Sequence, residues 1–206
     1  MNVKITSTVV IRPDACLVNG EIVLSFQENS DDGWFRQIYR FLQPDYPKFY
    51  KMDQLSQAAF LTVELLKKEA GNVLMTSSEE SVALIFANRE SSSVTDSLFI
   101  DSYQRNGSPS PSLFVYTLPN ILLGELSIRN KWYGENIFAV FPKFALDYYE
   151  KNARILLDDQ VTVILCGWVN VTEGKQEILV FTIENEPVDD AWNQLMVQRS
   201  GFEFTA

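Results

Sequence analysis

The chain of 206 residues is 46% hydrophobic, which is enough to bury a sizeable core, and its length predicts a single domain over residues 1–206. Its net charge of −10 argues against nucleic acid or an anionic membrane surface as the main partner, because both require a concentrated positive field. Two cysteines cannot build a disulfide framework, and no apolar run is long enough for a membrane span, so we expect a cytoplasmic protein.

The first hundred residues alternate between strand-like and helix-like patterns. We expect strands at 3–11, 21–26 and 81–88, a turn at 13–20, and helices at 31–42, 53–69 and 94–103. Ala58 and Ala59 are small enough for their helix to lie close against a neighbouring element. Residues 82–88 are almost continuously apolar, which is typical of a buried parallel strand.

The stretch from Pro109 to Lys143 joins a loop, an amphipathic helix, a tight turn and a strand without a break. Thr117 is the predicted N-cap of this helix, whose apolar face comprises Leu118, Ile121, Leu122 and Leu126. Gly134 supplies the turn into a buried strand at 136–141, and a second helix is expected to begin near Pro142.

The C-terminal third continues the alternation. We expect that second helix to run over 144–157, strands at 161–169 and 176–183 with a hairpin connection between them, and a short helix at 190–197. Strands separated by helices predict an α/β fold with a mixed, mostly parallel sheet and helices on its faces.

Several of these residues form a pattern that resembles a known family. The pattern comprises Ser110-Pro111-Ser112-Leu113-Phe114, Thr117-Leu118-Pro119-Asn120, Gly124, Ile128, Gly134, Met52-Asp53 and Ala153-Arg154. In order and spacing it resembles the N-terminal half of the β-ketoacyl-acyl carrier protein synthases, the condensing enzymes of the thiolase fold. The resemblance runs from about residue 52 to 171 and implies a thiolase-like half as the fold.

The same resemblance has departures that bear on catalysis. The resemblance puts Lys143, or a neighbouring residue, where the family has its catalytic cysteine, and the chain contains no histidine, although the family uses two. At 206 residues the chain is also roughly half the family's usual length. The resemblance therefore implies a protein without the family's catalytic residues.

The resemblance also implies a subunit interface. In the family, the strand before the nucleophile pairs antiparallel with its mate across a two-fold axis, and a nearby loop reaches the neighbouring subunit. The residues at the matching positions are candidates for an interface or pocket: Thr117, Asn120, Asn136, Ile137, Phe138, Val140, Phe141 and Phe144. A homodimer or a heterodimer with a full-length ketosynthase is the implied assembly, with an acyl carrier protein as a further candidate partner.

Other candidate chemistry is weighed from residue types alone. Lys143, at a helix N-terminus, could act as a base or an amine nucleophile, but a surface lysine is the favoured interpretation. Cys166 lies within an apolar run and is interpreted as a buried structural thiol. Glycine-rich phosphate loops and metal-ligand spacings are absent from the sequence, so we expect no cofactor and no metal.

Three functions remain open at this point. The first is a non-catalytic ketosynthase-like protein, an assembly or chain-length-factor-type partner in fatty-acid or polyketide type biosynthesis. The second is a β-ketoacyl-acyl carrier protein synthase that uses Lys143 or Cys166, or that a second chain completes. The third is an acyl or small-molecule binding module.

Overall fold

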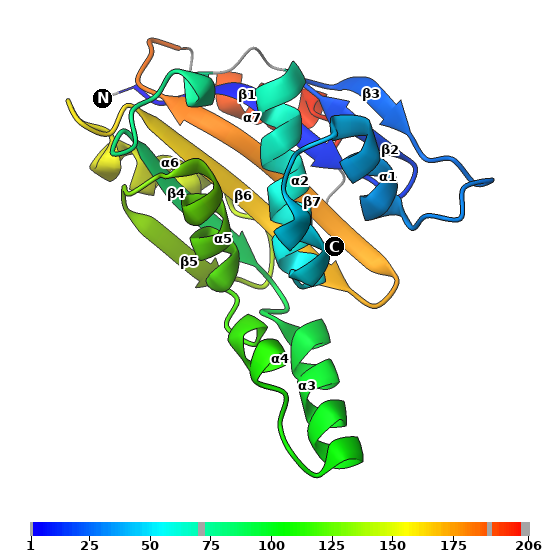
Figure 1. Cartoon of the computed structure of the whole chain (residues 1–206). Coiled ribbons are helices and arrows are strands. Elements are labelled where there is room, and N and C mark those ends of the chain that lie inside the picture. The colour runs from blue at the N-terminus through cyan, green and yellow to red at the C-terminus, as the bar shows by residue number, and fades with distance from the viewer. Residues whose placement is uncertain (1, 70–72, 189–190, 203–206) are drawn as a thin grey trace.

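The computed structural model describes residues 2–69, 73–188 and 191–202, and its centre is a seven-stranded sheet in the order β3-β2-β1-β7-β6-β4-β5 (Figure 1). The strands are β1 (Lys4–Ile11), β2 (Ala15–Val18), β3 (Glu21–Ser25), β4 (Val82–Asn88), β5 (Asn136–Val140), β6 (Val163–Thr172) and β7 (Lys175–Glu184). The helices are α1 (Trp34–Leu42), α2 (Gln54–Glu69), α3 (Ser93–Asn106), α4 (Pro111–Tyr116), α5 (Ile121–Asn130), α6 (Leu146–Leu156) and α7 (Trp192–Arg199), with 3₁₀ turns η1 (Pro47–Lys51) and η2 (Val73–Met75).

The sheet is mixed, and its antiparallel pairs outnumber its parallel ones. Strands β1, β2 and β3 form antiparallel hairpins, and β7 pairs antiparallel with both β1 and β6. The two parallel pairs are β4 with β5 and β4 with β6. The expectation of a mostly parallel sheet is therefore wrong, because the hairpin pairs β1–β2, β2–β3 and β6–β7 and the β1–β7 pair are all antiparallel.

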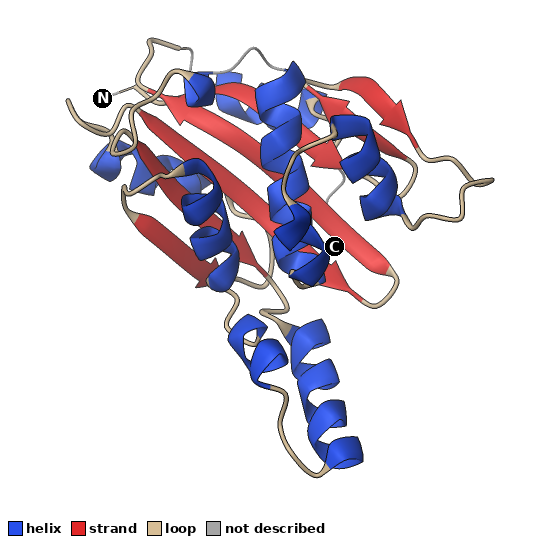
Figure 2. Cartoon of the chain, in the orientation of Figure 1, coloured by secondary structure: helices blue, strands red, loops and turns tan. Residues whose placement is uncertain are grey.

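One face of the sheet is covered by α1, α2 and α5 (Figure 2). Ala58 and Ala59 on α2 are fully buried, so this helix lies close against the sheet as its small residues predict. Asp53 accepts a hydrogen bond from the Ser56 N–H at 2.9 Å and thereby caps α2. Tyr39 stacks on Phe49 at 4.4 Å between ring centroids, which joins α1 to η1.

The opposite face is covered by α6 and α7, whose buried residues form a second core with strands β1, β2, β4, β6 and β7. Tyr149 on α6 donates a hydrogen bond to the Gly167 carbonyl at 2.9 Å. Asn193 on α7 accepts from the Ile5 N–H and donates to the Val3 carbonyl, and so fixes α7 to β1. Helices α6 and α7 therefore cover this side of the sheet.

The predicted elements are found with four corrections. Strand β2 lies within the expected turn at 13–20, and residues 111–116, expected as loop, form α4. Thr117 is not an N-cap, because it follows α4 and precedes α5. Helix α6 begins at Leu146 rather than near Pro142, because the chain first turns inward to bury Phe144 among aromatic rings.

Helices α3 and α4 together form an arm, defined here as residues 93–116, that projects beyond the end of the sheet (Figure 1). Phe99 on α3 contacts Phe114 on α4 at 5.7 Å between ring centroids. Ser110 caps α4 by accepting from the Leu113 N–H, and Pro111 occupies the first turn. The arm is therefore two paired helices with little core of their own.

Candidate interface at the open edge of the sheet

Strand β5 is an edge of the sheet, and among the described strands only β4 pairs with it. The Leu84 N–H donates to the Glu135 carbonyl, and the Phe141 N–H donates to the Asn88 carbonyl. Because backbone groups alternate along a strand, Asn136, Phe138 and Val140 direct their N–H and C=O groups away from β4. The expected buried strand is thus an open edge, ready to pair with another strand.

A hollow of about 630 Å³ lies between this edge strand and the start of α5. Its lining is Pro119, Asn120, Ile121, Leu123, Gly124, Asn136, Phe138 and Val140. Apart from its chain neighbours and the helix's own backbone, no atom lies within 4 Å of the position that a Cβ on Gly124 would occupy, so this part of α5 is open. Val140, at one side of the hollow, is 52% exposed. The hollow is therefore an apolar surface beside unpaired backbone groups.

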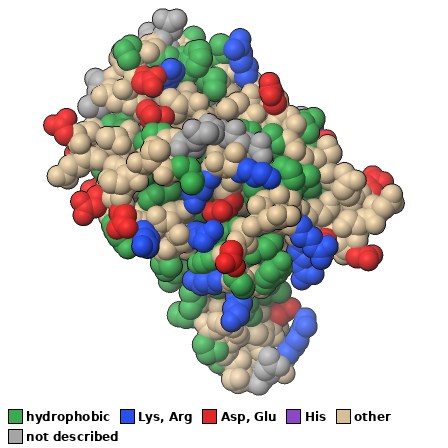
Figure 3. All heavy atoms as spheres, turned by 45° about the horizontal axis from the view of Figure 1, so that its top comes forward, with side chains coloured by type: hydrophobic (Ala, Val, Ile, Leu, Met, Phe, Trp, Pro, Cys, Tyr) green, Lys and Arg blue, Asp and Glu red, His purple; other side chains and the backbone are tan. Residues whose placement is uncertain are grey.

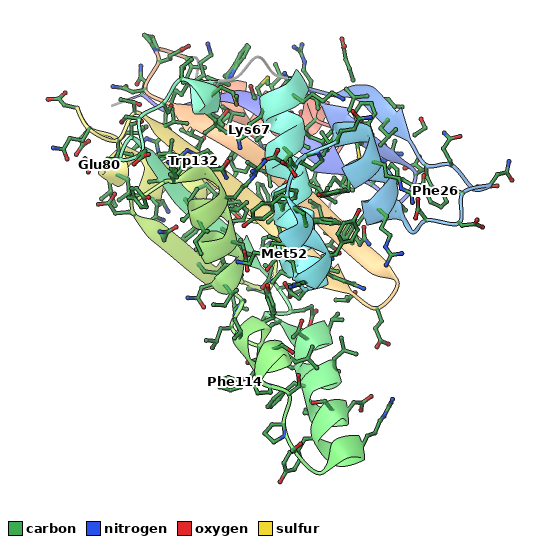
Figure 4. The ribbon with its side chains drawn as sticks, in the orientation of Figure 1. Phe26, Met52, Lys67, Glu80, Phe114 and Trp132 are labelled. Carbon is green, nitrogen blue, oxygen red and sulfur yellow. The ribbon has the colours of Figure 1, made fainter. Side chains whose placement is uncertain are left out.

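The arm presents further apolar side chains next to this hollow. Figure 4 labels Phe114 on the arm, which is 58% exposed, and Figure 3 shows hydrophobic side chains on the projecting end of the molecule. Large hydrophobic residues of the arm and the residues after it are about half exposed: Leu98, Ile100, Tyr103, Phe114, Val115 and Leu118. Exposed apolar side chains grouped in this way are typical of an interaction surface.

The candidate interface residues fall into two groups. Asn120, Asn136, Phe138 and Val140 all line the hollow, so the structure brings these four together. In contrast, Ile137, Phe141 and Phe144 turn to the opposite face and pack against the second core. Thr117 lies at the base of the arm, where its carbonyl accepts a hydrogen bond from the Ser92 hydroxyl.

At the corner after β5, the side chain of Lys143 lies in solvent and that of Phe144 packs against the protein. Lys143 is exposed, whereas Phe144 packs edge-on against Trp168 and stacks on Tyr149 at 5.5 Å. Rings of Phe181 and Phe202 complete this aromatic group. The space beneath the corner is therefore filled by aromatic side chains.

Both cysteines are buried. Burial raises the pKa of Cys16 to about 12 and raises the pKa of Cys166 well above its ordinary value. A thiol reacts as the thiolate, so these pKa shifts make both cysteines poor nucleophiles at neutral pH. Within the described parts of the chain, no cluster of three or more His, Cys, Asp or Glu side chains could hold a metal ion. The helices described there also include none that is long and apolar enough to cross a membrane.

A buried polar group joins the arm to the body, and sequence analysis did not identify it. The Tyr116 hydroxyl donates to Glu125 Oε1 at 2.9 Å, and Lys48 Nζ lies 2.6 Å from Glu125 Oε2. Burial, and then the hydrogen bond to Glu125, raise the pKa of Tyr116, so the phenol remains a donor. Glu125 lies within the apolar face of α5, where a charged residue is unusual. This glutamate is the sequence signal that could have revealed the buried polar group.

A second polar contact lies at the start of the arm. Thr95 on α3 donates to Asp53 Oδ2 at 3.1 Å, so the cap of α2 also binds the arm. Burial raises the pKa of Asp53, while hydrogen bonds from Ser56 and Thr95 act in the opposite direction.

Neither a protein-family model nor a curated protein sequence matches the chain, whereas solved structures do. A chain of the ishigamide ketosynthase/chain length factor aligns over 92% of this chain with a TM-score of 0.63 and 15% identity. A chain of the ketosynthase (ApeO)–chain length factor (ApeC) complex from Xenorhabdus doucetiae aligns over 98%, with a TM-score of 0.60 and 13% identity. The fold is that of the ketosynthases. The expected thiolase-like α/β architecture is thereby confirmed.

A third matching structure contains an acyl-carrier protein. It is a chain of AntDE:AntF, a type II polyketide synthase acyl-carrier protein in complex with its ketosynthase, with a TM-score of 0.56, 13% identity and coverage of 98% of this chain. The chain spans 64% of the ishigamide chain and 65% of this third one, but 92% of the Xenorhabdus chain. The Xenorhabdus chain is thus of nearly the same length as this one.

Proposed function

We propose that this chain is a non-catalytic ketosynthase-like subunit that pairs with a full-length ketosynthase. Its role would be that of an assembly or chain-length-factor-type partner in fatty-acid or polyketide type biosynthesis. The observation that carries the proposal is the open edge of β5, flanked by the apolar hollow and the arm. A strand from a partner would satisfy the outward backbone groups of Asn136, Phe138 and Val140 and cover the hollow.

Two further observations support a subunit role without catalysis. Lys143 at the family's nucleophile position is exposed, and the only two thiols are buried with raised pKa values. A chain of nearly the same length occurs in the Xenorhabdus ketosynthase–chain length factor complex. A chain of this size therefore occurs in the structure of such an assembly.

Strand pairing is tested most directly at Val140, whose N–H points to the open side. Val140→Pro removes that donor but leaves the alternate residues that pair with β4 unchanged. Val140→Thr is the matched control, because it keeps the shape and the N–H. Light scattering of each variant, alone and with a ketosynthase from the same genome, gives the mass of the assembly.

We expect a mixed complex for the native chain and for Val140→Thr, and loss of that complex for Val140→Pro. A stable homodimer whose mass does not change when the ketosynthase is added would refute the heteromeric proposal. The same strand edge could then pair two copies of this chain in a symmetric dimer. A native chain that stays monomeric in both samples would refute pairing altogether.

The hollow favours a second candidate function, the binding of an acyl chain or another small apolar molecule. Its volume of about 630 Å³ lies within the range of ligand sites, and Ile121, Leu123 and Phe138 are among its apolar residues. Native mass spectrometry after gentle purification would detect a retained fatty acid. If the spectra of the native chain and of Gly124→Ala both show only the mass of the protein, with no added ligand mass, stable acyl binding is excluded.

An acyl carrier protein is a further proposed partner, and the distribution of charge supports it. Figure 3 shows Lys and Arg side chains gathered over the face that carries α1, α2 and α5. Lys51, Lys68 and Lys131 are exposed there, whereas the carboxylates of Glu64 and Glu125 are largely buried in ion pairs. This local surface suits an acidic protein despite the net charge of −10.

A further inference from the structure

The arm depends on polar contacts at its base to keep one orientation. Most of its large apolar side chains are about half exposed, and although Tyr116 packs against the first core, the arm buries little apolar surface against the body. The contacts at its base are hydrogen bonds: Ser92 to the Thr117 carbonyl, Thr95 to Asp53, and Tyr116 to Glu125. Hydrogen bonds are directional, so they can define the angle at which the arm leaves the body.

Glu125 is the member of this set that connects the most elements. It lies on α5, receives the Tyr116 hydroxyl from the end of α4, and is ion-paired with Lys48 on η1. Its side chain is 7% exposed, whereas that of Lys48 is 42% exposed. A carboxylate buried in this way costs desolvation free energy unless its partners stay in place, so the three side chains hold one another in a fixed geometry.

The position of Glu125 also connects the arm to the proposed interface. The same helix carries Leu123 and Gly124, which line the hollow, and the residues between α4 and α5 include Pro119 and Asn120 of the lining. A rotation of the arm about its base would therefore move Leu118 and its neighbours relative to β5. The hollow and the arm would then no longer present one continuous surface.

We propose that the Tyr116–Glu125–Lys48 group is a positioning device that holds the arm in the orientation in which it binds the partner subunit. This inference rests on the proposed function for the identity of the partner. The orientation of the arm is a property of the isolated chain. Glu125 acts through Tyr116 and is a positioning residue, with no contact to the partner required of it.

The test compares three single variants of the full chain. Tyr116→Phe removes only the hydroxyl that donates to Glu125, and Glu125→Gln removes the charge at nearly constant volume. Tyr103→Phe is the matched control, because it removes a phenol hydroxyl from an exposed position on the same arm. Hydrogen exchange is measured for amides of the arm and for amides of α2, and ketosynthase affinity is measured separately.

We expect amides of the arm to exchange about five to ten times faster in Tyr116→Phe, which loses a hydrogen bond, and in Glu125→Gln, which loses the ion pair with Lys48. Exchange in α2 and in the control should be unchanged. Affinity for the ketosynthase should fall several-fold in the same two variants. Unchanged exchange in the arm of both variants would overturn the inference, and so would an equal increase throughout the chain. If the native chain binds no ketosynthase, the proposed function fails, while the exchange rates still decide the role of Glu125.

Discussion

Strands β5 and β6 both pair in parallel with β4, and they differ in what lies on their other side. Strand β6 receives β7 from the same chain, and nine of its ten residues are buried. Strand β5 has no described neighbour there, and both of its end residues are exposed. The difference separates residues that stabilise the fold from residues that are available to a partner.

The largest expected effect lies on the β6 side. A Cβ at Gly167 would lie 2.3 Å from the ring of Phe86, which is itself fully buried. Gly167→Ala should therefore lower the free energy of unfolding by about 3 kcal/mol, at the upper end of what overpacking costs. Urea denaturation checks this value. A loss below the measurement error would mean that the strands can move apart there.

Asp53 lies between the body and the arm and should have an intermediate effect. Asp53→Ala removes the cap of α2, so it should be about 1 kcal/mol less stable to unfolding than Asp53→Asn, which keeps an acceptor. Chemical denaturation of the two variants at one pH measures this difference. Equal stability of the two would show that the side-chain cap is not significant.

The same residue predicts a pH dependence. Burial raises the pKa of Asp53 in the folded state above 3.8, so folding favours its protonated form. That contribution to stability is complete below about pH 3.8 and is lost as the pH rises through the raised pKa. Relative to Asp53→Asn, the native chain should therefore lose stability over this window. A difference that stays constant with pH would contradict the raised pKa.

At Gly124, beside the open edge of β5, substitution by alanine should stabilise the fold, in contrast to Gly167→Ala. Gly124 lies within α5, and a Cβ there would meet no atom within 4 Å beyond the helix's own backbone and the two chain neighbours. Gly124→Ala should increase the free energy of unfolding by about 0.5 to 1 kcal/mol, because alanine favours the helix. The added methyl group would lie at the hollow, so affinity for a ketosynthase should fall. Denaturation and a binding titration on the same sample test both, and a destabilised variant with unchanged binding would contradict the comparison.

The smallest effect is expected at Lys143, which is exposed. Lys143→Ala should change the free energy of unfolding by no more than about 0.5 kcal/mol, which is typical of surface substitutions. Ketosynthase activity of the mixed complex should also be unchanged. A loss of activity with an intact fold would favour the alternative that this chain is itself a synthase that uses Lys143.

The sequence predicts the body of the molecule well because burial leaves a pattern. The apolar runs at β4 and β6, the small residues of α2 and the position of Gly134 all follow from close packing. The backbone of Val82 passes 2.4 Å from where a Cβ on Gly134 would lie, which explains that glycine. Ser110 and Pro111 are also a helix-start signal, and α4 begins there.

Other features could not be derived from periodicity. The run at β5 is apolar, and a single sequence cannot tell an open edge from a buried strand when both contain residues such as Ile137 and Phe138. Tyr116, Glu125 and Lys48 are far enough apart in sequence that only the fold brings them together. The direction of pairing in the sheet likewise depends on which strands become neighbours.

The most direct test of the central claim is amide hydrogen exchange along β5, with and without a ketosynthase from the same genome. The amides of Asn136, Phe138 and Val140 face the open side, whereas those of Ile137 and Ala139 face β4 and serve as internal controls. Pairing predicts that the first three become slow in the complex while the two controls, already protected, change little. Unchanged rates at the three outward amides in a mixture that forms a complex would contradict the claim that β5 is the pairing edge.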